Sequence, residues 1–232
     1  MLSGFLLKKL EMTQVYREDG ELTAATICEA RPCYITMVKT LEKDGYLAAQ
    51  LAAGKKKRIN KPMTGHFKKA KINFTPLILK EVGISGGDKP PELGLEIKVS
   101  DVLKPGFLAD IVGVIKGRGF SGVIKRWGFH SQPKTHGQSD RERAPGSIGA
   151  QTPGRVDKGK KMPGHYGASR KTVRNIEILS VDEETQRVFL KGAIPGYKNS
   201  WFLIKPKKEK KNFIALRKPN VEKEQESEQI KS

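Results

Sequence analysis

The residues best able to do chemistry in this sequence are the lysines and arginines of residues 116–174, between which glycine recurs every few positions. This segment holds 14 Lys and Arg against three acids, which is +11 of the chain's formal charge of +19. Between residues 129 and 165 it has almost no apolar residue with which to build a core, so self-packing cannot offset its ordering entropy. We therefore expect a polyanion to order it, and the phosphates of RNA or DNA are the simplest candidates.

Two further basic runs accompany this segment. Residues 55–71 hold eight Lys and Arg with no acid before Glu81, and residues 205–218 hold seven with a single acid, Glu209. The rest of the chain is net acidic. Basic faces on such a body indicate a large and specific binding surface rather than general solubility charge.

Three glycines in the main basic segment have the spacing of a dinucleotide fingerprint. Gly117, Gly119 and Gly122 form a G-x-G-x-x-G motif, which in Rossmann folds seats a pyrophosphate. No βαβ repeat follows, and Asp140, the acid near the required offset, lies in a Gly/Ser/Arg-rich stretch. We therefore favour glycines that let the backbone approach a phosphate chain. A nucleotide-dependent oxidoreductase is the rival hypothesis.

Trp127 follows two cations, Lys125 and Arg126. Its ring could stack on a base or a sugar, or it could anchor the root of the basic segment in the protein core. The sequence leaves both interpretations open for Trp127 and favours RNA contact for Arg126.

Catalysis is not expected from the polar residues of this segment. His136, Ser139 and Asp140 have the residue types of a triad, but a glycine-rich loop lacks the rigid support that a catalytic base needs. His130, His136 and His165 have no metal-ligand spacing. Residues 143–155, which contain two prolines and three glycines, indicate a stiff, narrow tip, and residues 158–165 are its basic return leg.

Short alternating runs outside the basic segments predict strands at residues 22–28, 33–41, 45–51, 77–82, 96–99, 110–116, 175–181, 185–191 and 200–205. Short helices are expected only at residues 63–71 and 121–127. The pattern predicts a mainly β protein with a barrel. One domain, residues 1–206, would carry a basic insertion at 55–95 and a long loop at 129–167, followed by a tail (207–232) that is first basic and then disordered.

Cysteine use and hydropathy indicate a soluble intracellular protein. Cys28 and Cys33 lie in apolar, strand-like sequence without a second pair, so we expect two buried structural thiols rather than a zinc site. No apolar run approaches the length of a membrane span.

Several stretches together resemble the universal family of large-subunit ribosomal protein three in its bacterial form. They read MTQVY (12–16), GHF (65–67), KGRGFSGVIKRW (116–127), THG (135–137), PGSIG (145–149), QTPG (151–154), KGKKM (158–162) and KGAIPG (191–196). They occur in order over residues 3–206, which makes the resemblance specific. It implies a six-stranded barrel of the translation-protein type, with a long loop that threads large-subunit rRNA toward the peptidyl-transferase centre.

The resemblance also implies a non-catalytic role. Such a protein binds rRNA near its 3′ end, acts early in subunit assembly and contacts neighbouring large-subunit proteins in the cytoplasmic ribosome, without cofactor, metal, membrane or small-molecule substrate. The glutamine that matches Gln151 can be N5-methylated in bacterial relatives. The residues that we expect to bind rRNA are Lys55, Lys56, Lys57, Arg58, Lys68, Lys69, Lys116, Arg118, Lys125, Arg126, Trp127, His136, Arg141, Arg143, Gln151, Arg155, Lys158, Lys160, Lys161, His165 and Arg170.

Two residue pairs depart from the family pattern. Leu10-Glu11 stands where an apolar residue and a glycine usually form a tight N-terminal turn. Val114-Ile115 replaces a Ser/Thr pair, which removes hydroxyls that could bond the backbone or a phosphate.

Overall fold

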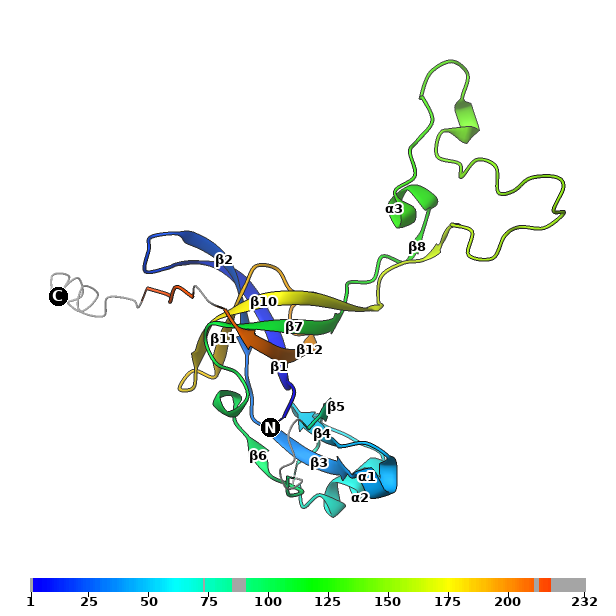
Figure 1. Ribbon diagram of the computed structural model, residues 1–232. Helices are drawn as coiled ribbons and strands as arrows, with labels where there is room; N and C mark the ends of the chain where they lie inside the picture. Colours follow the sequence, from blue (N-terminus) through cyan, green and yellow to red (C-terminus); the bar gives the residue numbers. More distant parts are fainter. Residues whose placement is uncertain (1, 73, 85–90, 211–212, 218–232) are drawn as a thin grey trace. The chain divides into compact units, whose positions relative to one another are not determined.

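A computed structural model describes residues 2–72, 74–84, 91–210 and 213–217 of the chain (Figure 1). It divides into two compact units. The barrel unit comprises residues 1–114 and 171–232, and the excursion unit comprises residues 115–170.

Six strands of the barrel unit close into a barrel, which confirms the predicted fold class. The strands, in their order around the barrel, are β1 (Phe5–Tyr16), β12 (Trp201–Glu209), β7 (Phe107–Val114), β10 (Arg170–Asp182), β11 (Arg187–Lys191) and β2 (Leu22–Glu29). Closure leaves no free sheet edge. The excursion unit connects β7 to β10, which are neighbours in the barrel.

The longest N-terminal strand, β1, has no counterpart among the predicted strands. Its side chains do not alternate: Phe5, Leu6 and Leu7 are all fully buried. The pairing register with β2 shifts between Lys9 and Glu11, so the Leu10-Glu11 departure lies at a bulge inside a strand and not in a tight turn. Phe5, Leu6 and Leu7 all belong to the core cluster that includes residues of both the barrel and a second sheet, so successive side chains of this part of β1 are buried.

Both cysteines lie in the main core and are free, as predicted. Burial is the main cause that raises the pKa of the Cys33 thiol, to about 12. Burial likewise raises the pKa of Cys28. Thiols held in their neutral form are poor nucleophiles and poor metal ligands, which fits a structural role.

A second sheet, absent from the sequence-based expectation, belongs to the same unit. It has the order β5 (Ile78–Gly83), β4 (Ala48–Ala53), β3 (Cys33–Lys39) and β6 (Glu96–Ile97), with helices α1 (Leu41–Asp44) and α2 (Lys61–Lys69). Its buried residues Ile35, Leu51 and Val82 belong to the same core cluster as the barrel. The segment predicted as a basic insertion, 55–95, therefore supplies α2 and β5. The predicted helix at 63–71 is α2.

The excursion unit contains little regular structure. Its elements are β8 (Phe120–Ser121), the short helix α3 (Val123–Trp127), a 3-10 turn (Ser139–Arg141) and β9 (Gly164–His165), which pairs with β8. The helix predicted at 121–127 is α3. None of residues 124–166, all of which the structure describes, is buried. This agrees with a segment whose composition cannot supply a core.

Candidate nucleic-acid interface

The root of the excursion unit is a short ladder between its outgoing and returning legs. The Arg118 N–H donates to the Tyr166 carbonyl at 2.8 Å, and the Tyr166 N–H donates to the Gly119 carbonyl at 2.9 Å. The Ile115 N–H donates to the Ser169 carbonyl at 3.1 Å, so the Val114-Ile115 departure leaves this backbone group bonded without any hydroxyl. The ladder fixes where both legs start.

Gly167 allows the two legs to approach this closely. It has φ of +76°, and a Cβ at this position would lie 2.3 Å from the Lys116 carbonyl oxygen. Any other residue would collide with backbone there, and the left-handed conformation would add strain. Glycine at this position is thus a structural requirement of the root.

Trp127 ties the two legs together a few residues further out. Its indole N–H donates to the Met162 carbonyl at 2.9 Å, and Arg126 donates to the same oxygen at 2.7 Å. The Arg126 guanidinium lies 5.0 Å from the indole centroid, and the Lys161 ammonium lies 5.9 Å from it. Trp127 is 43% exposed, so it anchors one leg to the other and not to a hydrophobic core. The interpretation that Trp127 anchors the root in the protein core is therefore wrong, and its stacking on a base or a sugar stays a prediction.

Nearly all of the predicted rRNA-binding side chains of the excursion unit are exposed to solvent. Except for the half-buried Arg126, every one that the prediction placed in this unit is exposed: Lys116, Arg118, Lys125, Trp127, His136, Arg141, Arg143, Gln151, Arg155, Lys158, Lys160, Lys161, His165 and Arg170. At the tip, a Cβ on Gly149 would meet only the Arg155 carbonyl, at 3.7 Å. The free fold therefore does not itself require glycine at that position.

The triad and metal hypotheses find no support in the geometry. No hydrogen bond joins His136 to Ser139 or Asp140, all of which the structure describes, and His136 and Ser139 occupy turn conformations with positive φ. Within the described part of the chain, no group of three His, Cys, Asp or Glu side chains is placed to hold a metal. Gly117, Gly119 and Gly122 precede a helix of only five residues rather than a βαβ crossover.

A second group of predicted residues lies in the barrel unit. Lys55, Lys56, Lys57 and Arg58 follow β4, and Lys68 and Lys69 end α2; all six are exposed. The GHF stretch of α2 positions Lys68 and Lys69, which follow it in the helix. Phe67 is buried against Ala70 and Ile72, and the His66 ring pairs with the Gln50 side chain of β4 at 2.8 Å. This motif therefore packs the helix on its sheet.

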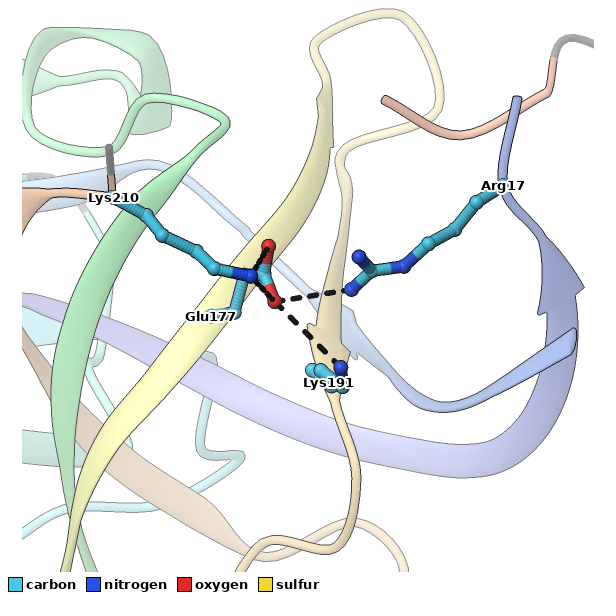
Figure 2. A network of polar contacts seen from close by, with 4 residues as sticks. All are labelled: Arg17, Glu177, Lys191 and Lys210. Carbon is cyan, nitrogen blue, oxygen red and sulfur yellow. Dashed lines mark hydrogen bonds and ion pairs between the residues drawn. The ribbon is translucent and has the colours of Figure 1, made fainter. Parts of the chain in front are cut away.

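The third basic run differs from the other two because acids of the barrel pair with it. Lys207 lies 2.9 Å from Asp110, and Lys210 contacts both oxygens of Glu177 at 3.0 and 3.1 Å. Burial alone would raise the pKa of Asp110, but the bonds from Lys207 and from the Asn175 N–H together hold it below its usual value. Figure 2 shows the buried Glu177 carboxylate at the centre of three cations, from different parts of the barrel unit.

One exposed aromatic residue, Phe120, is missing from the predicted rRNA-binding residues. Phe120 is 82% exposed, the highest value for a large hydrophobic side chain among the described residues. Its position between Arg118-Gly119 and Lys125 was the available signal, because an aromatic ring in a basic, glycine-rich stretch has no core to enter.

Comparison with known proteins identifies the family. The family model of ribosomal protein L3 matches residues 92–206. The large ribosomal subunit protein uL3 of Dehalococcoides mccartyi is 47% identical over 207 residues, covering 88% of this chain and 98% of that protein. Those of Pelotomaculum thermopropionicum (47% over 208 residues; 88% and 97%) and Chlorobaculum tepidum (45% over 206 residues; 88% and 98%) are similarly close. Among the described residues, none of the helices has the length and apolar content to cross a membrane. The chain belongs to the ribosomal protein L3 family, and it is accordingly a structural constituent of the large ribosomal subunit and not an enzyme.

Proposed function

We propose that this chain binds large-subunit rRNA in the cytoplasmic ribosome, through the cations of the excursion unit and those around α2. The observation that supports this most is that residues 124–166 contain no buried residue while their lysines and arginines, apart from the half-buried Arg126, are exposed. A segment of this kind gains its order from a partner. Closely packed phosphates repel one another, and cations that neutralise them release counterions, which drives binding.

The finer role follows from the family resemblance. We propose that residues 1–206 form one domain that docks near the 3′ end of the rRNA early in assembly. The loop at 129–167 then reaches toward the peptidyl-transferase centre, and neighbouring ribosomal proteins contact the domain. Gln151 is exposed near the tip, so a methyltransferase could reach it before assembly. Mass spectrometry of the protein from purified ribosomes would show whether it carries a methyl group.

The salt dependence of rRNA binding tests the proposal. The variant R155A/K158A/K160A removes three exposed cations and spares Lys161, which lies over the Trp127 ring. Each lost phosphate contact should flatten the slope of log K against log salt by roughly 0.7–0.9. We expect weaker binding and a shallower slope than for wild type.

The matched control removes three exposed lysines of the barrel unit, K43A/K80A/K104A, and so changes net charge equally. It should keep the wild-type slope. If R155A/K158A/K160A keeps the wild-type slope as well, these cations make no phosphate contact and the proposal is wrong.

A further inference from the structure

Phe120 has a fixed place although its ring is in solvent. It pairs with His165 across β8 and β9, and the adjoining Gly119 carbonyl accepts from the Tyr166 N–H at 2.9 Å. On its other side, Ser121 is 4% exposed and its hydroxyl donates to the Arg118 carbonyl at 3.1 Å. The backbone is thus held on both sides while the side chain projects outward. Such a ring is presented at low entropic cost to a ligand.

The surroundings of Phe120 are cationic. A depression of about 270 Å³ beside it is lined by Arg118, Lys125 and Arg143 together with Phe120 and residues 121–124, and no acid lines it. A purely apolar partner would have to desolvate these charges without compensation, which is costly. A ligand that offers both a flat apolar face and negative charge matches the depression better.

The other aromatic rings of the excursion unit are already engaged. The Trp127 ring makes cation–π contacts with Arg126 and Lys161, and its indole N–H donates to the Met162 carbonyl. The Tyr166 ring is also in use, because the Arg118 guanidinium lies 5.1 Å from its centroid. Phe129 is half-buried. In this unit, all of which the structure describes, Phe120 is the aromatic side chain most open to a new face-to-face contact.

We propose that the Phe120 ring stacks on an unpaired base of the large-subunit rRNA, while Arg118, Lys125 and Arg143 hold the adjoining phosphates. This rests on the proposed rRNA binding and adds a base-stacking site to it. Unpaired bases in folded RNA are commonly held by aromatic side chains, and every base has a π-face, so the contact gives affinity with little sequence preference.

The test compares F120L and F120W in the full-length protein, with purified large-subunit rRNA as the probe. Leucine keeps an apolar side chain but has no π-face, so affinity should fall by about 5- to 150-fold, the equivalent of about 1–3 kcal/mol for one stacked base. The slope of log K against log salt should stay at the wild-type value, because no charge is lost. Tryptophan should retain most of the affinity. The thermal midpoints of both free variants should match wild type, since the ring makes no core contact.

Three outcomes would overturn the proposal. If wild type binds rRNA and F120L binds equally well, the stacking site is wrong while rRNA binding stands. If F120L binds rRNA normally but fails to enter large subunits, the ring contacts a protein instead of a base. If wild type itself does not bind the rRNA, rRNA binding and stacking fall together.

Discussion

At the scale of single residues, Glu177 is a buried acid of the barrel unit that pairs with three cations. Its carboxylate is 4% exposed and accepts from Arg17, itself 3% exposed, at 3.0 Å. Lys210 binds both its oxygens, and Lys191 lies 3.9 Å away (Figure 2). The Arg17 Nε has no hydrogen-bond partner, so its guanidinium depends on this carboxylate for compensation. A buried charge without its partner is strongly destabilising.

We predict that Glu177→Leu lowers the free energy of unfolding by about 3–5 kcal/mol, because it leaves the Arg17 charge buried and uncompensated. Glu183→Leu, at an exposed turn position, is the control and should change it by less than about 0.5 kcal/mol. Denaturant unfolding of the full chain measures both. The double variant R17M/E177L should recover much of the loss, since an apolar pair replaces an ion pair. If it is as unstable as E177L, the uncompensated charge is not the cause.

At the scale of elements, the chain after β12 lies against the barrel. The Glu18 N–H donates to the Ala215 carbonyl at 3.1 Å, and the Arg217 N–H donates to the Tyr16 carbonyl at 3.0 Å. Phe213 packs on Gly106, where an added Cβ would meet its ring at 3.0 Å. The prediction ended the barrel at residue 206, but β12 continues to Glu209. The disorder predicted for the end of the 207–232 tail falls on residues outside the described part of the chain.

We expect this C-terminal segment to stabilise the barrel. Phe213→Ala should lower the thermal midpoint and cost about 1–2 kcal/mol, because it removes an apolar ring that is partly buried. Ile214→Ala, which truncates the exposed neighbouring side chain, should cost less than about 0.5 kcal/mol. Calorimetry on both variants makes the comparison. Equal midpoints would mean that the segment lies on the barrel without stabilising it.

At the scale of the whole molecule, the two units differ in how they obtain order. The barrel unit has a continuous core that includes Phe5, Ile111 and Ile204, whereas residues 124–166 have none. Amide exchange reports this difference directly, since protection follows local stability.

In the free protein we predict strong protection in β1 and β7 and near-complete exchange across residues 129–163. In purified large subunits both regions should be protected, because rRNA orders the excursion unit. The barrel strands serve as the internal control in each sample. Strong protection of residues 129–163 in the free protein would show that the unit orders itself, contrary to its composition.

The sequence by itself determined features that depend on local pattern and composition. Alternating apolar residues predicted a mainly β chain, and helices at residues 63–71 and 121–127 were found as α2 and α3. The scarcity of apolar residues between 129 and 165 was enough to predict a segment without a core, because so little apolar surface cannot offset the entropy of ordering the chain.

Only the tertiary structure decided which distant residues meet. Asp110 and Glu177 pair with Lys207 and Lys210, so two cations of the third basic run already have partners within the barrel unit. The choice between barrel and second sheet for each strand likewise depends on pairing partners far along the chain. The surroundings of the aromatic side chains also depend on distant residues. The Trp127 indole N–H donates to the carbonyl of Met162, which is 35 residues away, whereas the Phe120 ring is exposed to solvent. Periodicity and composition depend on residues that are close together in the sequence. Burial, strand pairing and charge compensation arise instead from contacts between segments that are far apart in the sequence.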